Sequence, residues 1–360
     1  KEQVSVSSDR FTRDIARLPV ANGMLDLEQL KLESHSPKHF SRWKLSVPWT
    51  DQFGVPRRFM EFLAWMFPSR QDRRLAVDVL AMAISGNPAQ RLVLLTGDGG
   101  TGKSTFIHLL GELVGPRAFG ELDLANAGQR FESGHWADQL VLHQSEAHTN
   151  LLRGNERFLK SISGQDPMEG RVKYGRDKIP FVPKALPIIT ANTSLRLRLK
   201  GDARAWRRRL IVLETDGEAL TDEEQVDEYH KHLLEAEGPA ILRLIATRAQ
   251  ALLQDGFSGL STTQQARADT VIEGFDPLQV FVDECVVQEN GAHLYGGELR
   301  QVAAEWLRVR DHDVPSSDVG FGRRLAPIVE ELGGVKCNSL PDHPEHSSGG
   351  WRHVRLIRAG

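Results

Sequence analysis

The residues best suited to chemistry form a glycine-rich stretch at 97–105, which reads Gly-Asp-Gly-Gly-Thr-Gly-Lys-Ser-Thr. It matches the pattern G-x-x-x-x-G-K-[ST] and lies between a β-like run at 91–96 and an apolar, helical run at 106–114. In this context backbone N–H groups and the start of the helix converge on phosphate oxygens. The lysine contacts the β- and γ-phosphates of a nucleotide, and the hydroxyl after it holds Mg²⁺. A chance glycine turn would not combine all of these features.

The stretch therefore predicts a site for ATP with Mg²⁺, in which Lys103 acts on the phosphates and Ser104 binds the metal ion. The predicted nucleotide-binding residues are Gly97, Asp98, Gly99, Gly100, Thr101, Gly102, Lys103, Ser104 and Thr105.

Two polar residues that follow later apolar runs could complete a hydrolytic site. Glu146 comes just after the run 139–143, where an NTPase needs an acidic residue to polarise water or bind Mg²⁺. The residue before it is not acidic, so Glu146 is the candidate general base and, with Ser104, a candidate metal-binding residue. Its alternative role is to cap a helix. Asn192 follows the run 185–190 and could hold the attacking water, although such an asparagine is usually a turn residue.

A concentrated positive stretch follows at 196–209, where seven Lys and Arg residues stand against Asp202 alone. In a ring-forming ATPase, an arginine here can reach the γ-phosphate of the neighbouring subunit and stabilise the transition state. Arg207 and Arg208 are the candidates for this catalytic role. The alternative is a solvated face that pairs with the acidic segment 216–237.

The composition and charge of the chain exclude several classes of protein. The chain has 360 residues, of which 40% are hydrophobic and 26% charged, so it can bury real cores. A net charge of −3 excludes a uniformly basic nucleic-acid coat, so any nucleic-acid surface must be local.

Two cysteines exclude a disulfide framework and a four-cysteine zinc site, which indicates an intracellular protein. We expect no membrane span and no signal peptide, because apolar stretches are short and the chain opens on Lys1 and Glu2. The absence of an initial Met fits a fragment of a longer protein.

The elements that must position the site are predicted from periodicity. Helical spacing predicts a pair of helices over 57–85, separated at Pro68. Residues 1–55 are mixed and turn-rich, and 256–265 has the composition of a linker. The predicted strands lie at 91–96, 139–143, 185–190 and 210–214. Strand–loop–helix order around them is typical of an α/β domain.

The last 85 residues predict helices at 277–288, 297–310 and 317–332, followed by strand, turn and strand. This order is typical of a winged helix-turn-helix, with the wing across 341–350. The third helix carries few cations, so we expect it to steer duplex or dock a partner rather than read sequence. The expected organisation is an N-terminal helical segment at 1–88, an NTPase core at 89–215, a helical extension and linker at 216–270, and a winged-helix domain at 271–360.

In this order, the motifs resemble the superfamily 3 helicase module of the phage and plasmid primase–helicase family, over nearly the whole chain. Besides the glycine-rich stretch, Ser145-Glu146 and Ala191-Asn192, the similar segments are Asn22-Gly23-Met24-Leu25-Asp26-Leu27, His35-Ser36-Pro37, Lys160 with Gly164-Gln165-Asp166, Arg171-Val172-Lys173-Tyr174-Gly175 and Ala205-Trp206-Arg207-Arg208. Thr101 and Gln165 depart from the family pattern, which has Asn and Gly there. The resemblance implies an AAA+-type P-loop NTPase with a parallel sheet, assembled as a homohexameric ring with ATP between subunits and DNA in the central channel.

The resemblance also gives a role to 170–183, whose alternating short runs around 175–177 predict a β-hairpin. Its candidate DNA-binding residues, which offer cations and a stacking ring, are Lys173, Tyr174, Arg176 and Lys178. From the residues alone, a merely solubilising hairpin is an equal alternative.

Together these features lead us to expect an ATP-dependent DNA helicase of phage or plasmid replication. The alternative is a DNA-binding regulatory or origin-remodelling ATPase that does not unwind processively. Expected partners are single-stranded DNA, forked duplex, further copies of the chain in a hexamer, and a primase or polymerase domain upstream or in trans. The expected location is the cytoplasm of a bacterial host.

Overall fold

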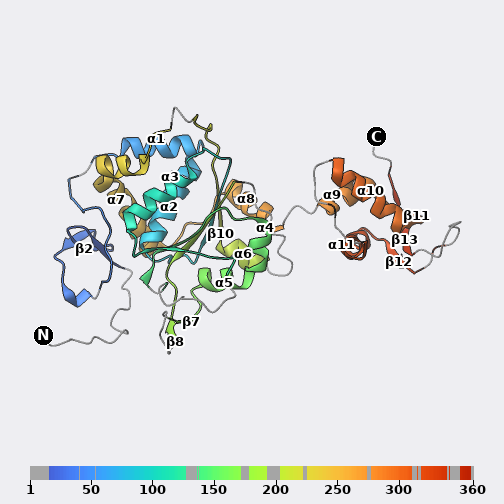
Figure 1. Ribbon diagram of the computed structural model, residues 1–360, viewed down its shortest axis with the longest axis horizontal. Coiled ribbons are helices and arrows are strands. Elements are labelled where there is room, and N and C mark those ends of the chain that lie inside the picture. Colours follow the sequence, from blue (N-terminus) through green and yellow to red (C-terminus); the bar gives the residue numbers. More distant parts are fainter. Residues whose placement is uncertain are drawn as a thin grey trace. The chain divides into compact units, whose positions relative to one another are not determined.

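The structure is a computed structural model that describes residues 16–39, 41–52, 54–126, 136, 138–171, 178–192, 203–221, 225–273, 277–309, 314, 318–338, 340 and 349–357. The chain divides into two compact units, Lys1–Glu273 and Gly274–Gly360, and each is described by itself (Figure 1). Within the described residues, no helix is long and apolar enough to cross a membrane.

A small antiparallel sheet opens the first unit. Its strands are β1 (Arg17–Val20), β2 (Gly23–Asp26) and β3 (Lys31–Glu33), followed by the 3₁₀ turn η2 (Pro37–His39). Leu18 and Leu25 are buried partners across β1 and β2. The segment after η2 folds back onto this sheet, since the Asn22 amide donates to the Trp49 carbonyl at 2.8 Å and accepts from the Trp49 N–H at 2.9 Å.

Two helices follow, α1 (Arg57–Met66) and α2 (Arg70–Ile84). Pro68 lies between them, and the Ser69 hydroxyl caps α2 by accepting from the N–H of Asp72. The helix pair and its separation are as predicted.

The centre of the first unit is a five-stranded parallel sheet. Its strands are β4 (Leu92–Thr96), β5 (Phe119–Glu121), β6 (Val141–Gln144), β9 (Leu186–Ala191) and β10 (Leu210–Glu214). The spatial order is β10-β4-β9-β6-β5, and every neighbouring pair is parallel. The chain leaves β4 toward β5 on one side, whereas β10 pairs on the other, so the direction of winding switches at the end of β4. Open parallel sheets bind ligands at such a switch point.

Helices cover both faces of this sheet, which explains the near-continuous apolar strands. Alternate residues of β4 point to opposite faces, so Val93 and Leu95 pack with one set of helices, and Leu92 and Leu94 with the other. The first set is α1, α2, α3 (Lys103–Val114) and α7 (Tyr229–Asp255). The second is α4 (Thr149–Gly154), α5 (Glu156–Gly164), α6 (Ala203–Arg209) and α8 (Thr262–Glu273). The mixed α/β class with a parallel sheet is confirmed.

The second unit has its own core, built around Phe281, Trp306 and Trp351. Its elements are α9 (Pro277–Cys285), β11 (Val286–Tyr295), α10 (Gly296–Val309), α11 (Asp318–Glu331), β12 (Val335–Cys337) and β13 (Gly350–Leu356). The antiparallel sheet has the order β11-β13-β12.

Three expectations need correction. The turn-rich start holds the sheet β1–β3. The first C-terminal helix ends at Cys285, and the polar strand β11 follows where the helix was expected to continue. The expected linker at 256–265 runs into α8, whose Ala268 and Ile272 are buried. Within the described residues, the hairpin strands are β7 (Met168–Arg171) and β8 (Lys178–Phe181), which pair antiparallel.

Candidate functional site

The glycine-rich stretch forms the turn from β4 into α3, at the switch point of the sheet. At two positions of the turn only glycine fits, because the φ angle is positive and a Cβ would clash with a neighbouring side chain. Gly97 has φ +138°, and a Cβ there would lie 2.0 Å from the Thr215 hydroxyl. Gly102 has φ +85°, and a Cβ would lie 2.6 Å from the Trp65 ring. Glycine at these two positions thus lets the turn pack closely against Thr215, after β10, and against α1.

Lys103 is the first residue of α3 and is buried at 7% exposure. Its ammonium donates to the carbonyls of Gly97 at 2.7 Å and Asp98 at 2.5 Å. Burial lowers the pKa of Lys103, and the Asp98 carboxylate acts in the opposite direction. The ammonium therefore satisfies two neutral acceptors inside the turn, which a phosphate oxygen could replace with a charge-assisted bond.

A pair of threonines ties the turn to the end of β10. The Thr101 hydroxyl lies 2.7 Å from the Asp98 carbonyl and 2.6 Å from the Thr215 hydroxyl, and it donates its one proton to one or the other of these oxygens. The Thr215 hydroxyl in turn donates to the Thr96 carbonyl at 3.2 Å. These contacts fix the turn against the end of β10, and residues 99–105 of the turn line the cavity beside it.

That cavity has a volume of about 810 Å³. The predicted site residues that line it are Glu146, Asn192 and, from the glycine-rich stretch, Gly99, Gly100, Thr101, Gly102, Lys103, Ser104 and Thr105. Glu146 and Asn192 follow the carboxyl ends of β6 and β9, which are neighbours in the sheet. Parallel strands end at the same edge, so residues 46 positions apart in the sequence meet.

Glu146 has φ +48°, an uncommon conformation for a residue with a Cβ, and its side chain is exposed. The next residue is anchored, since the Ala147 N–H donates to the Thr190 carbonyl at 2.9 Å. The alternative role as helix cap is wrong, because His148 caps α4 with its ring nitrogen. Glu146 is therefore held at the cavity by a strained backbone rather than by a helix start.

His143 lies in the same region, and its ring nitrogen Nε2 is 3.1 Å from the Thr190 hydroxyl. Burial lowers the pKa of His143 to about 4, and His108 adds a smaller effect of the same sign. At neutral pH the ring is uncharged, so it contributes a polar contact and no charge to the cavity.

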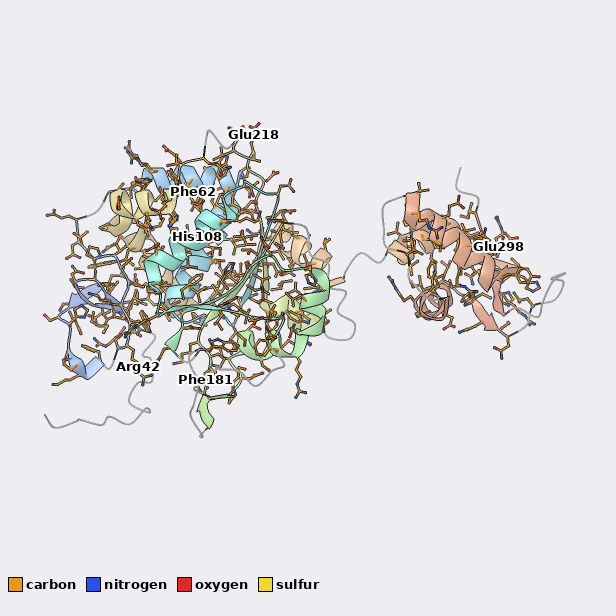
Figure 2. All side chains as sticks on the ribbon, viewed as in Figure 1. Arg42, Phe62, His108, Phe181, Glu218 and Glu298 are labelled. Carbon is orange, nitrogen blue, oxygen red and sulfur yellow. The ribbon has the colours of Figure 1, made fainter. Side chains whose placement is uncertain are left out.

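An aromatic wall that the sequence pattern does not reveal lines the same cavity beside the glycine-rich turn. Phe62 and Trp65 come from α1 and Tyr229 from the start of α7, with ring centroids 6.2 Å apart for Phe62–Trp65 and 5.9 Å for Phe62–Tyr229. Leu220 and Val226 extend this wall. Figure 2 labels Phe62 on α1 and His108 on α3. The signal in the sequence is the aromatic content of 57–66, whose helical spacing by itself indicates only packing.

Among the described residues that line the cavity, neither Arg207 nor Arg208 occurs. Both are exposed on α6, and the Arg207 Nε donates to the Asp269 carboxylate of α8 at 2.7 Å. Asp269 is not part of the acidic segment 216–237, with which the alternative interpretation paired these arginines. Between them and the sheet, Trp206 is fully buried.

The hairpin residues Lys173, Tyr174 and Arg176 lie outside the described residues, and Lys178 is described only as part of the backbone of β8. The antiparallel pairing of Arg171 with Lys178 confirms a hairpin. Its DNA-binding role stays a prediction.

Within the described residues, no group of three or more His, Cys, Asp or Glu side chains is arranged to hold a metal ion. The donors that could serve Mg²⁺ at the cavity are the exposed Ser104 hydroxyl and the Glu146 carboxylate. An oxygen set of this kind fits a magnesium ion that takes its other ligands from water and phosphate.

Comparison with family models gives two matches. Residues 1–68 match a family described as D5 N terminal like, and residues 95–209 match a family of unknown function, DUF5906. The second match spans the glycine-rich turn, Glu146, Asn192 and both candidate arginines. A comparison with curated proteins found no match.

Among solved structures, the chain is similar to the A form apo structure of the NrS-1 C terminal region, with 13% identity over 86% of this chain and 78% of that one, and a TM-score of 0.49. A second apo structure of that region has 13% identity, the same coverage and a TM-score of 0.48. A third match to it has 15% identity over 80% and 68% of the two chains and a TM-score of 0.44. These TM-scores are too low to carry an argument. The D5 N terminal like match is the finding that supports the resemblance to the phage primase–helicase family.

Proposed function

We propose that the chain is the ATP-driven motor of a DNA helicase of phage or plasmid replication. The observation that carries the proposal is the single cavity that joins Lys103 and Ser104 at the start of α3 with Glu146 and Asn192 at the ends of neighbouring strands. A phosphate-binding turn, an acid and an amide at one sheet edge form the set that nucleotide hydrolysis requires.

The proposed roles follow from position. The N–H groups of the turn and Lys103 bind the phosphates, with the ammonium exchanging the carbonyls of Gly97 and Asp98 for phosphate oxygens. Glu146 accepts the proton of the attacking water, and Asn192 orients that water. Ser104 and Glu146 would hold Mg²⁺, which supplies neutralisation of phosphate charge. The aromatic wall offers a flat, apolar surface to the base.

Assembly and DNA contacts complete the proposal. In a ring, Arg207 and Arg208 of one subunit would reach the cavity of the next, which fits their exposure on α6 outside their own cavity. The hairpin β7–β8 would contact DNA in the channel. The element order of the second unit, helix–strand–helix–helix–strand–strand, supports a winged helix.

The test separates binding from hydrolysis. Lys103→Ala should weaken both, because it removes a charge that acts on ground and transition states. Glu146→Gln should bind ATP normally while hydrolysis falls about 10²–10⁴-fold, because the shape is kept and the base is lost. Glu156→Gln, a change of the same kind in α5, is the control. Near-normal turnover in Glu146→Gln would overturn the assignment of the base.

Strand displacement on a forked duplex then separates the helicase from a regulatory ATPase. ATP turnover stimulated by DNA without displacement would support the regulatory alternative. Mass measurement with ATP and single-stranded DNA reports whether a ring forms.

A further inference from the structure

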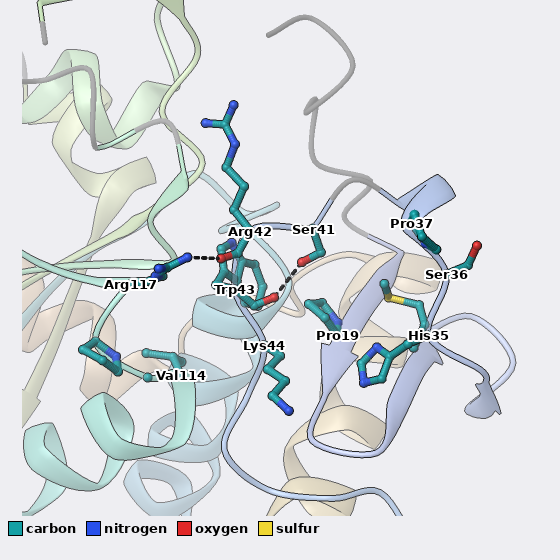
Figure 3. A pocket seen from close by; sticks show the side chains of 13 residues that line it. Pro19, His35, Ser36, Pro37, Ser41, Arg42, Trp43, Lys44, Val114 and Arg117 are labelled. Carbon is teal, nitrogen blue, oxygen red and sulfur yellow. Dashed lines mark hydrogen bonds between the residues drawn. The ribbon is translucent and has the colours of Figure 1, made fainter. Parts of the chain in front are cut away.

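A second cavity, of about 840 Å³, lies between the small N-terminal sheet and the end of α3 (Figure 3). Its walls come from β1 and β2, from the segment 35–44, and from the turn at 114–117. Within the described residues that line it, there is no Asp or Glu. This cavity shares no lining residue with the candidate nucleotide site.

The segment that forms one wall is the most one-sided in charge of the N-terminal region. From 34 to 50 the sequence holds three lysines and arginines and two histidines, and no acidic residue. In a chain with net charge −3, such a segment creates a local positive potential that the composition as a whole does not supply.

Two cations at the cavity are not neutralised. Lys44 and Arg117 are exposed, and within the described part of the chain neither has a carboxylate at salt-bridge distance. Arg117 Nη1 donates to the backbone carbonyl of Arg42 at 3.3 Å, a neutral acceptor that orients the guanidinium and keeps its charge. Arg42 itself pairs with Asp138 at 2.8 Å, and Figure 3 shows its side chain extending away from the other labelled residues.

Trp43 stands between these cations, half-buried at the cavity wall, with Lys44 and Arg117 on different sides of it in Figure 3. Its backbone is fixed, since the Ser41 hydroxyl donates to the Trp43 carbonyl at 2.6 Å and the Leu45 N–H donates to the Pro19 carbonyl at 2.8 Å. An indole on a fixed backbone at the wall of a cavity can receive a flat base without a large ordering cost.

We propose that this cavity binds a single-stranded polynucleotide, with a base stacked on Trp43 and backbone phosphates on Lys44 and Arg117. Aromatic rings flanked by cations are the means by which proteins bind single strands without sequence preference. Lys38 is exposed on η2, next to the lining residue Pro37, and adds a third cation to the segment, which fits a polymer better than one phosphate group. A duplex keeps its bases stacked inside, so it cannot offer one to a ring in a concave wall.

The cavity shares no residue with the nucleotide site or with the hairpin strands. The test uses the full chain with Lys103→Ala as background to remove ATP hydrolysis, and the variants at the cavity leave the hairpin unchanged. Anisotropy of a labelled oligothymidylate measures affinity across a salt series. The double change Lys44→Glu with Arg117→Glu should weaken binding at least about tenfold. It should also lower the slope of log affinity against log salt by about 1.4, the contribution of two phosphate contacts to a single strand.

A matched control makes the same net change of charge at two other positions in the first unit. It is the double change Arg70→Glu with Arg157→Glu, and both arginines are exposed on helices. Equal loss in both double variants would mean a general charge effect and would overturn the proposal. Trp43→Leu should weaken binding about tenfold and Trp43→Phe much less, because only the latter keeps a stacking face.

Photo-crosslinking locates the contact directly and does not depend on a variant that folds. An oligonucleotide carrying iododeoxyuridine should crosslink within the peptide that contains Trp43. Crosslinks confined to other segments would overturn the proposal. So would competition by free thymidine monophosphate as strong as that of the oligothymidylate at equal nucleotide concentration, since the site would then take single nucleotides.

Discussion

The hydroxyls of Thr101 and Thr215 lie 2.6 Å apart, although the residues are 114 positions apart in the sequence. Thr101 belongs to the glycine-rich turn, and Thr215 follows directly after β10. The Thr215 hydroxyl also occupies the space beside Gly97 that a side chain there would fill. The end of β10 thus determines the conformation of the turn that binds phosphate in the proposed function.

From this contact we expect Thr215→Val to weaken ATP binding several-fold while leaving the fold intact. Valine keeps the shape of threonine but loses the bonds to Thr101 and to the Thr96 carbonyl, so the turn is less ordered before binding. Titration with a fluorescent ATP analogue measures the effect. The control is Thr247→Val on the exposed face of α7, where the hydroxyl bonds only the Arg243 carbonyl. Unchanged affinity in Thr215→Val would show that the turn does not depend on β10.

A buried ion pair should determine how firmly α8 is held. Arg267 of α8 contacts Asp72 of α2 through two nitrogens, at 3.2 and 3.0 Å, and Gln264 donates to the same carboxylate at 2.9 Å. Asp72 is 5% exposed. We expect Arg267→Ala to lower the free energy of unfolding of the first unit by about 3 kcal/mol, because it leaves a buried carboxylate unpaired.

Denaturant unfolding measures this loss, and Glu33→Ala supplies the comparison. Glu33 pairs with Arg17 near the surface, so its removal should cost less than about 1 kcal/mol. The double change Asp72→Ala with Arg267→Ala should cost less than the sum of the two single changes. Additive losses would mean that the two side chains do not interact in solution.

His143 should make the first unit less stable in acid. Its pKa in the folded chain is about 4, below the ordinary value of 6.5, because the ring is buried. As pH falls below 6.5 the unfolded chain takes up this proton first, so stability is lost between about pH 6.5 and 4. At roughly 1.4 kcal/mol per pKa unit, the loss amounts to at most about 3 kcal/mol.

His143→Gln should flatten this part of the pH dependence of the urea midpoint, since an amide can still contact Thr190 but does not titrate. His232→Gln, exposed on α7, should leave the profile as it is. If both variants keep the original slope, acid sensitivity arises from other groups.

The candidate site was predictable because its residues follow strongly apolar strands. Glu146 and Asn192 could be placed at one edge without knowing the strand order, since parallel strands all end at the same edge. The aromatic wall was not predictable in this way. Phe62, Trp65 and Tyr229 lie on helices that pack beside the turn, and their spacing alone is that of an ordinary core.

The strands that were not predicted lack a local pattern for two different reasons. Strands β1 to β3 are three or four residues long, too short for a period-2 pattern to stand out. Strand β11 carries Gln288 and Glu289 on exposed positions, and its pairing with β13 decides its form.

Gln165, which departs from the glycine of the family pattern, adopts φ +58° at the end of α5. Its side chain donates to the carbonyls of Gly86 and Asn87 at 3.0 and 3.1 Å, contacts that offset the cost of the left-handed conformation.

The last prediction concerns Arg207 and Arg208 in the proposed ring. Trp206 is fully buried and fixes α6, so the arginines after it project from the surface outside the cavity of their own chain. An arginine that acts across a subunit boundary contributes about 10³–10⁵ in rate, far more than a surface pair such as Arg207 with Asp269 contributes to stability. Hydrolysis should therefore rise steeply with protein concentration.

The decisive measurement mixes two inactive variants, Lys103→Ala and the double change Arg207→Ala with Arg208→Ala. At some boundaries of a mixed ring, an intact turn from one chain meets intact arginines from the other, so ATP hydrolysis should partly return. Mixing the double variant with Glu146→Gln should restore activity in the same way, because Glu146 belongs to the cavity and not to the surface that carries Arg207 and Arg208.

Asp269→Asn in place of the arginine changes is the control for the ion pair alone, and it should retain hydrolysis. If mixing restores nothing while rings still form by mass, the two arginines act within their own chain or only in packing, and Arg204 or Arg209 becomes the residue to change next.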